Sequence, residues 1–599
     1  MTTKKRRASI GRLFFQAKRY VLTHRLPIIV GGSLFVSLFL WQYLTTGSRI
    51  LEGDFDYYSQ LYEAFRISVL KFHQFPLWNP WMSGGIPLLA NPQFGLLSIQ
   101  ALLVVVFGAV YGLKLAYICY AIAGFWGMYA LCRQPAVQAG KLRSLLVAGL
   151  WVCNGFFAGH SISHFTFSSF FLLPWLFYIL MRWRQKNAWL QLVLLEAIII
   201  FSSVHYAFLV INFAFVVSLA FMAIVTALRG SLTKKLVSSF AAFLLKAGAV
   251  TITLSAYRLY FAFDYTMHNP RPEALLLESR PGILTVFKAI FLPIGTLLDV
   301  PSGTQWGWGE YSMYIGLGAA VTCVIIILYL LRGLITRKRS AIKHYFDQVN
   351  PLTAGMLGLG LTGFALAIGD FGPFSPYHIL RELPGFSDTR VSARWLSVTI
   401  FSIFVLLAAW KPWRKAINVL LAAAVLELFV SFGSPRLSGT NFISLPAKPF
   451  PAAYQTYDNS LHHDDFADSP LHSYYYSTSV NTGQVYSDDS IINTLNKVLN
   501  TTKCGANTNP KCGLVLSNNA TVTYWSPNKL ALKRTGPGAI TLNMNTEKGW
   551  RINGSYPFAG QSQLNPAINF TIPGSDTATY ELIYAPKASP SWLTWKLSK

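Results

Sequence analysis

The chain is divided into a series of apolar segments of about membrane-spanning length, with short basic clusters between many of them. A helix that crosses the hydrocarbon core of a bilayer needs roughly 20 consecutive apolar residues, and these segments approach that length. The chain is 53% hydrophobic and only 12% charged, a balance that 599 residues would accommodate poorly in one water-soluble domain. The sequence therefore predicts a polytopic α-helical membrane protein whose first partner is the lipid bilayer.

We expect about eleven transmembrane helices of roughly 20 residues each. The expected spans are 26–47, 111–132, 142–159, 163–181, 188–205, 206–228, 237–260, 311–331, 353–370, 395–410 and 416–433. A further apolar run, 94–108, is interpreted as an interfacial or re-entrant segment on the outer side. Counting it as a crossing would place the later basic clusters outside, against the rule that basic loops stay in the cytoplasm.

The basic residues indicate how the chain is oriented. Segment 1–25 carries eight Lys and Arg residues and no acid, and it directly precedes the first apolar run. A cleaved signal peptide is the alternative, but this run is too long for one and no small-residue cleavage site follows it. The N-terminus is therefore expected in the cytoplasm, and an odd number of crossings places the C-terminus outside. We interpret the net charge of +26 as this loop bias and not as a nucleic-acid surface.

The composition changes after Gly433 to polar, turn-forming and aromatic residues. We therefore expect a transmembrane domain over 26–433, with a first outer loop at 48–110, and a separate extracytoplasmic domain over 434–599. Short β-branched and aromatic segments in the second domain are typical of antiparallel strands in a sandwich. One helix is predicted there, at 487–500.

Two cysteines, Cys504 and Cys512, lie close together in the predicted outer domain. Oxidising conditions outside the cytoplasm favour a disulfide between them. A zinc site is the alternative, but no further Cys and no nearby His completes a tetrahedral set. The sequence therefore predicts the disulfide and no metal.

The first outer loop begins with two carboxylates, Asp54 and Asp56, beside the exit of the first span. Closely spaced Trp, Pro, Asn and Gly residues over 53–95 are typical of a shaped, packed loop. We expect an extended start to this loop, where residues two apart point to the same side; in a helix they would diverge. Asp56 would then orient a substrate or bind a cation, and Gln60 would hydrogen-bond substrate hydroxyls.

Further polar residues gather at the predicted outer ends of the helices. The candidates for substrate binding are His160, His164, His205, Arg258, Glu310, Arg390 and Arg394. The two histidines in 160–164 are one helical turn apart, but without a third ligand they suit hydrogen bonding to substrate or helix capping better than a metal pair. His205 carries the same ambiguity. The two arginines in 390–394 suit a phosphate group, with ordinary lipid headgroups as the alternative.

Two charge pairings are expected inside or near the spans. Glu310 lies in an aromatic setting and is expected to bind substrate hydroxyls or a basic partner such as Arg258. Glu196 and Lys246 lie at nearly equal depth in neighbouring spans, so we predict that they pair, because a lone intramembrane charge is expensive.

Four segments resemble the bacterial YfhO-like membrane proteins, in the order in which that family has them. They are the first outer loop with PLWNPWMSGGIPLLANPQFG, then WGEYSMYIGL at 308–317, LPGFSDTRVSARWL at 383–396 and EKGWRINGSYP at 547–557. The resemblance extends over nearly the whole chain. That family belongs to the GT-C type of integral membrane glycosyltransferases.

The resemblance implies transfer of a sugar from a polyprenyl-phosphate donor to an extracytoplasmic glycan, lipid or cell-envelope polymer. The acidic residue that this family uses in the first outer loop corresponds to Asp54, which would act as general base on the acceptor hydroxyl. No cofactor is predicted, a divalent cation is not indicated, and localisation in the cytoplasmic (inner) membrane is implied. A lipid or polysaccharide transporter and an envelope-assembly scaffold are the alternatives; a transporter would be expected to show inverted repeats, which are not evident.

Overall fold

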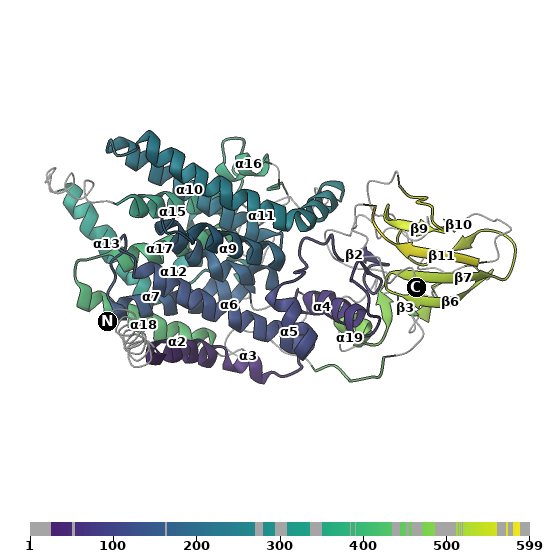
Figure 1. The fold of residues 1–599 in the computed structure, drawn as a ribbon. Helices are drawn as coiled ribbons and strands as arrows, with labels where there is room; N and C mark the ends of the chain where they lie inside the picture. Colours follow the sequence, from purple (N-terminus) through teal and green to yellow (C-terminus); the bar gives the residue numbers. More distant parts are fainter. Residues whose placement is uncertain are drawn as a thin grey trace, which may run out of the picture.

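The fold joins a helical bundle to a strand-rich C-terminal part, which lies beyond one end of the bundle (Figure 1). The computed structural model describes residues 26–50, 54–161, 164–269, 280–293, 308–335, 350–383, 385–387, 389, 391–433, 444–450, 455–457, 470–484, 511–512, 514–515, 517, 519–559, 571–572 and 579–587. The described part of the chain is mostly helical, and its strands are confined largely to the C-terminal region.

The bundle is built from apolar helices. They are α2 (Leu26–Phe39), α3 (Trp41–Thr45), α6 (Ala109–Cys132), α7 (Lys141–Cys153), η3 (Phe165–Leu172), α8 (Leu173–Met181), α9 (Ala188–Ser202), α10 (Tyr206–Leu228), α11 (Lys234–His268), α12 (Gly282–Phe291), α13 (Leu317–Ile335), α15 (Pro351–Ala367), α17 (Leu396–Ala409) and α18 (Arg414–Phe432). Each of the eleven predicted spans overlaps at least one of these helices. Helix α12 was not predicted.

Six helical segments of the described chain are long and apolar enough to cross a membrane. They are Ala109–Cys132, Lys141–Gly159, Tyr206–Leu228, Lys234–His268, Ser392–Ala409 and Arg414–Phe432. In Ser392–Ala409, 83% of the most apolar 18-residue stretch is buried inside the protein, whereas the corresponding share in α11 is 11%. Segment 392–409 is therefore a central element, whereas α11 presents a largely apolar outer face of the kind that lipid covers. The number of crossings and their sidedness stay predictions.

The start of the first outer segment is a helix and not the extended chain that we expected. Helix α4 covers Asp54–Leu70 and carries both early carboxylates in its first turn, where the helix dipole favours negative charge. No Gly or Pro interrupts its sequence until Pro76, so nothing breaks the helical hydrogen-bond pattern. The prediction that Asp54 and Asp56 point to the same side is therefore wrong.

After α4 the chain forms the packed loop that its composition predicted. The loop contains β1 (Trp78–Asn79) paired with β2 (Ile86–Pro87), and α5 (Ile99–Phe107) follows it. Trp78 and Trp81 are 1% and 0% exposed. Gly85, at φ +101°, lies so close to the Trp78 indole that a Cβ would approach it to 2.5 Å, so another residue here would displace the ring.

The C-terminal part is built around a four-stranded antiparallel sheet with the order β6-β7-β11-β9. Its strands are β6 (Ala520–Ser526), β7 (Lys529–Arg534), β9 (Trp550–Ile552) and β11 (Thr579–Tyr584), and smaller sheets pair β4 (Thr482–Gln484) and β5 (Lys511–Cys512) with β3 (Gln455–Tyr457), and β8 (Ile540–Thr541) with β10 (Thr571–Ile572). The expected antiparallel strands are confirmed in this sheet. The predicted helix at 487–500 lies outside the described residues.

Backbone hydrogen bonds join the first outer segment to the C-terminal part. The Gly84 amide donates to the Gln484 carbonyl at 2.8 Å, and the Gln484 amide donates to the Trp81 carbonyl at 2.9 Å. The Asn545 amide donates to the Gly84 carbonyl at 2.7 Å. These groups are buried, so each would cost stability if it lost its partner. The loop and the C-terminal part therefore form one packed unit.

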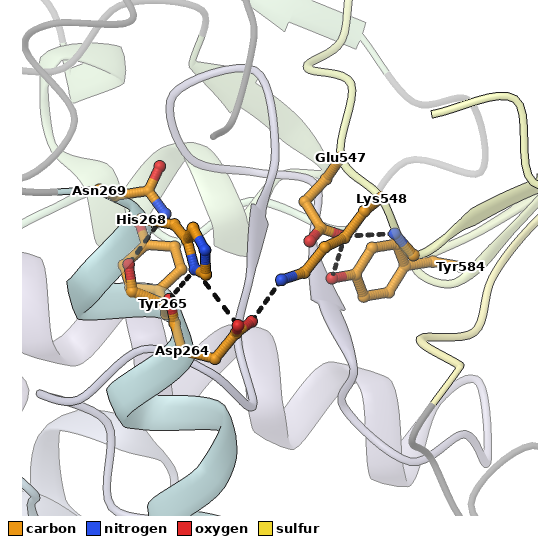
Figure 2. Close-up of polar contacts among 8 residues, drawn as sticks. Asp264, Tyr265, His268, Asn269, Glu547, Lys548 and Tyr584 are labelled. Atoms are coloured by element: carbon orange, nitrogen blue, oxygen red, sulfur yellow. Dashed lines mark hydrogen bonds and ion pairs between the residues drawn. The ribbon is translucent and has the colours of Figure 1, made fainter. Parts of the chain in front are cut away.

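A polar network connects the same C-terminal part to the end of α11 (Figure 2). The Lys548 ammonium lies 2.5 Å from the Asp264 carboxylate, which also faces His268. Beside this ion pair, the Glu547 carboxylate accepts hydrogen bonds from the Gly549 amide at 2.6 Å and from the Tyr584 hydroxyl at 2.8 Å. The network therefore fixes the C-terminal part to the bundle at a second place.

Burial raises the pKa of Glu547, and the nearby Asp264 charge adds to this rise, while the Gly549 amide, the Tyr584 hydroxyl and Lys548 oppose it. The folded chain thus holds the Glu547 proton more tightly than the unfolded chain does. Its contribution to stability is present at acidic pH and is lost as the pH rises through the raised pKa. We expect Glu547→Gln, which stays neutral, to gain thermal stability relative to the wild type as the pH rises above about 4, the ordinary pKa range of a Glu carboxyl, toward neutral.

Thermal unfolding of the detergent-solubilised chain, followed by tryptophan fluorescence, measures this difference. Glu581→Gln is the matched control, because the Glu581 side chain is 51% exposed. A wild-type minus Glu547→Gln difference that stays constant across this pH range would contradict the prediction.

Candidate functional site

Five residues predicted to form the site come from five separate segments of the bundle. They are Asp54 at the start of α4, His164 just before η3, His205 just before α10, Glu310 in η6 (Trp308–Tyr311) and Arg394 in η7 (Ser392–Trp395). His164 and His205 directly precede helices, and Glu310 and Arg394 lie in short 3-10 helices. Asp54 is the first residue of α4. Polar groups suit such positions, because helix ends leave backbone groups that need partners.

Arg394 and Glu310 form a two-point ion pair. The Arg394 Nε donates to Glu310 Oε2 at 3.0 Å, and Nη2 donates to Oε1 at 2.6 Å. The Arg394 side chain is 4% exposed and that of Glu310 is 25% exposed. Fork-to-fork pairing of this kind fixes both side chains as well as neutralising them. Glu310 therefore pairs with Arg394, and the predicted pairing with Arg258 is wrong.

Two aromatic rings hold the Arg394 guanidinium between them. Its Cζ lies 4.6 Å from the ring centre of Tyr206 and 5.3 Å from that of Phe167. A guanidinium is attracted to the face of an aromatic ring, most strongly where water is excluded. The carboxylate of Asp54 also acts electrostatically on this guanidinium, more weakly than that of Glu310. Asp54 thus lies in the same electrostatic environment as the ion pair.

Two imidazoles complete the cluster. The His164 Nδ1 lies 3.0 Å from the Tyr58 hydroxyl and 2.7 Å from the Thr166 hydroxyl. The His205 ring is nearly parallel to the His164 ring, with 6.3 Å between centres, and its other neighbour is Tyr206 at 4.8 Å. Residue 58 is one helical turn beyond residue 54 on α4. We call the set Asp54, Tyr58, His164, His205, Tyr206, Glu310 and Arg394 the outer-end cluster.

Asp54 differs from the ion pair in the cluster because its side chain is exposed, whereas Glu310 and Arg394 are at least partly buried against each other. It is the first residue of α4. The unpaired N–H groups of a helix start favour the ionised form of a carboxylate. The arrangement therefore offers an accessible carboxylate beside a neutralised, rigid pair and two imidazoles that carry donor and acceptor nitrogens.

Asp56 and Gln60 face away from this cluster. Asp56 is 2% exposed and accepts hydrogen bonds from Ser473 and the two following amides of the C-terminal part. Gln60 is fully buried and donates to Asn79 at 3.1 Å. The predicted role of Asp56 was derived from an extended segment, and that of Gln60, binding sugar hydroxyls, from its position six residues after Asp54. The helix instead directs these side chains into packing contacts, so we leave them out of the proposed site.

Arg258 is committed to the backbone of the first outer loop. The side chain is 1% exposed, and its two terminal nitrogens donate to the carbonyls of Leu89, Asn91 and Phe94 at 2.5, 2.8 and 2.6 Å. These contacts hold the loop against α11. We therefore interpret Arg258 as a structural residue and do not carry it into the substrate site.

The predicted ion pair between Glu196 and Lys246 is wrong. The Glu196 carboxyl lies within hydrogen-bonding reach of Asn212, and the Lys246 ammonium lies 3.9 Å above the Trp189 ring. Each charge is thus stabilised on its own, by an amide and by a ring face.

Several predicted features lie outside the described residues. They are the side chains of His160 and Cys512, and residues Arg390 and Cys504 as a whole. The phosphate contact by Arg390 and the disulfide therefore stay predictions. Within the described ranges, no group of three or more His, Cys, Asp or Glu residues is placed to hold a metal ion.

Sequence reasoning missed the aromatic residues that belong to the cluster or contact it. Tyr58, Phe167 and Tyr206 contact the charged or imidazole groups, yet aromatic residues are common throughout this chain, with 29 Tyr and 43 Phe. The spacing of four residues from Asp54 to Tyr58 is a usable signal once α4 is assigned as a helix.

Comparisons with known proteins give one distant structural likeness to report. No protein-family model matches the sequence, and no curated protein matches it. Among solved structures, the chain is similar to the crystal structure of the Archaeoglobus fulgidus oligosaccharyltransferase in the apo form, with a TM-score of 0.39 and 13% identity. The match covers 79% of this chain and 65% of the archaeal chain. The roles of the site residues rest on the contacts described above.

We predict that Glu310 and Arg394 are energetically coupled. Glu310→Gln removes the charge that compensates a guanidinium only 4% exposed, and breaking such a pair from one side costs about 3 kcal/mol or more. Arg394→Gln in the Glu310→Gln background removes the stranded charge, so the double variant should be less destabilised than the sum of the two single variants. Unfolding in mixed micelles with increasing SDS measures all four chains. Strict additivity would show that the pair contributes no coupling.

Proposed function

We propose that the chain is a membrane glycosyltransferase of the GT-C type. It would transfer a sugar from a polyprenyl-phosphate-linked donor to an extracytoplasmic glycan, lipid or cell-envelope polymer, working in the cytoplasmic (inner) membrane with its C-terminal part outside. The resemblance of four sequence segments to the YfhO-like proteins supports the reaction class. The geometry of the outer-end cluster supports the placement of the base.

The observation that carries the proposal is that Asp54 is exposed and that its carboxylate acts electrostatically on the Arg394 guanidinium, which is paired with Glu310. A general base must be ionised, reachable by the acceptor and held in place. Asp54 is reachable because its side chain is exposed, and it begins α4, where the helix dipole favours negative charge. Glu310 is engaged at both oxygens by Arg394 and is a poorer candidate.

In the proposed reaction, Asp54 removes the proton of an acceptor hydroxyl as its oxygen attacks the anomeric carbon of the donor. The bond from that carbon to the phosphate oxygen breaks, and polyprenyl phosphate leaves with its negative charge. Lipid presentation places the phosphate at headgroup level and the sugar in the loop region. No nucleotide site is then needed outside the cell.

The other cluster residues have roles that fit this sequence of events. The Nε and Nη2 groups of Arg394 donate to Glu310, so we propose that a phosphate contact is made through Nη1, together with Arg390. The imidazoles of His164 and His205 are proposed to hydrogen-bond sugar hydroxyls. Glu310 would hold Arg394 in position for this contact.

The proposal predicts that Asp54→Asn loses transfer activity. An amide cannot accept the proton, and loss of a general base costs about 10²- to 10⁴-fold in rate. Purified protein is incubated with labelled polyprenyl-phosphate sugars and candidate acceptors, and product is quantified for the wild type and the variant. Glu581→Gln is the control, because its exposed carboxylate lies in the C-terminal sheet. Undiminished transfer by Asp54→Asn would contradict its role, and donor movement without transfer would favour a transporter.

A further inference from the structure

Helix α4 has two faces with different partners. At 100° per residue, Asp54 and Tyr58 lie on one side of the helix, and Asp56, Gln60 and Glu63 lie on the opposite side. The contacts follow this division. Tyr58 meets His164 of the bundle, whereas Asp56 and Gln60 meet residues 473–478 of the C-terminal part. Figure 1 shows α4 between the bundle and α19 (Tyr474–Ser479).

Asp56 binds the N-terminus of α19. Its Oδ1 accepts from the Ser473 hydroxyl at 2.6 Å and from the Tyr475 amide at 3.1 Å, and its Oδ2 accepts from the Tyr474 amide at 2.6 Å. Ser473 also caps α19 by accepting from the Tyr476 amide at 3.1 Å. An ionised carboxylate with three donors is a strong contact, because charge-assisted hydrogen bonds are about twice as strong as neutral ones.

A second contact lies one turn further along the same face. Gln60 donates to the Thr478 hydroxyl at 3.0 Å and to Asn79 at 3.1 Å, and Asn79 donates back to Gln60 at 3.1 Å. Gln60 and Asn79 are both 0% exposed. The C-terminal part therefore holds the first two turns of α4 on the side opposite the outer-end cluster.

The first turn of a helix lacks intrahelical partners for its amides and opens readily unless it is held from outside. Asp54 is in that turn, about 3 Å along the helix axis from Asp56. We propose that the C-terminal domain positions the catalytic carboxylate in this way, with Asp56 as the positioning residue and the α19 N-terminus as its anchor. The role of Asp54 in this statement rests on the proposed function, whereas the anchoring of the turn does not.

The first test separates position from charge. In Asp56→Asn, the amide group faces the backbone donors of α19, so the turn should loosen and kcat should fall about 10- to 100-fold, as expected for a small misplacement, with little change in the donor KM. Asp56→Glu keeps the charge and should recover part of the rate. Ser473→Ala removes one donor only and should give a smaller loss, which covers the case in which Asp56→Asn fails to fold.

The second test restores the position without the charge. Asp56→Cys and Ser473→Cys are combined in a background in which the native cysteines are replaced, and the two thiols are joined by a short thiol-specific cross-linker. The cross-linked protein should regain most of the lost kcat, and reduction should remove the gain. Asp54→Asn in the same cross-linked background is the matched control and should stay inactive. A cross-linked protein that is as inactive as Asp56→Asn, with a normally protected turn, would show that Asp56 acts in the chemistry and would overturn the inference.

Hydrogen exchange gives a readout that does not depend on the reaction. Amides of residues 54–60 and 474–479 should exchange faster in Asp56→Asn than in the wild type, while those of α17 should not change. If wild-type protein transfers no sugar but this local loosening is seen, the anchoring stands and the proposed function fails. If exchange and kcat are both unaltered in Asp56→Asn, the positioning role is refuted.

Discussion

The packing of the loop after α4 against α11 and the C-terminal part depends on hydrogen-bond partners for the buried polar groups of that loop. Arg258 is a charged residue that is only 1% exposed, and its two terminal nitrogens donate hydrogen bonds to three loop carbonyls. The C-terminal part supplies further partners, through backbone bonds at Gly84 and Gln484 and through the Asn545 side chain, which donates to the Ser83 and Gly85 carbonyls at 2.6 and 2.9 Å. A loop with this many backbone groups out of water is stable only if each finds a partner.

This arrangement explains why the two faces of α4 can have different partners. One face is fixed by the C-terminal part, so the other can present an exposed carboxylate without depending on the bundle alone for its position. On the bundle side, the charges of Arg394 and Glu310 cancel within a pair that aromatic rings enclose. The exposed carboxylate thus acts next to a rigid ion pair that has no net charge. Such a pair suits the proposed reaction, in which negative charge moves from an acceptor to a leaving phosphate.

Local patterns in the sequence predicted much of the architecture. Apolar runs located all eleven expected helical segments, and alternating strands located β6, β7 and β11, because burial imposes a period on the residues of one element. The helix at Asp54 was missed because the Pro, Gly and Trp residues that follow it were taken as typical of the whole loop. Helix α12 was missed because its ten residues are too few to resemble a span. The charge pairings were wrong at Arg258 and at Lys246, since a carbonyl triplet and an indole ring each replaced a carboxylate. Such partners are distant in sequence and leave no periodic signal.

The bond between Asp56 and Ser473 joins residues that are 417 positions apart in the chain. Synthesis and membrane insertion proceed from the N-terminus, so α4 emerges long before α19 exists. The turn that carries Asp54 therefore reaches its final state only after the chain has been made through α19 and α19 has packed against α4. A chain that stops before α19 would lack the contact that fixes the start of α4.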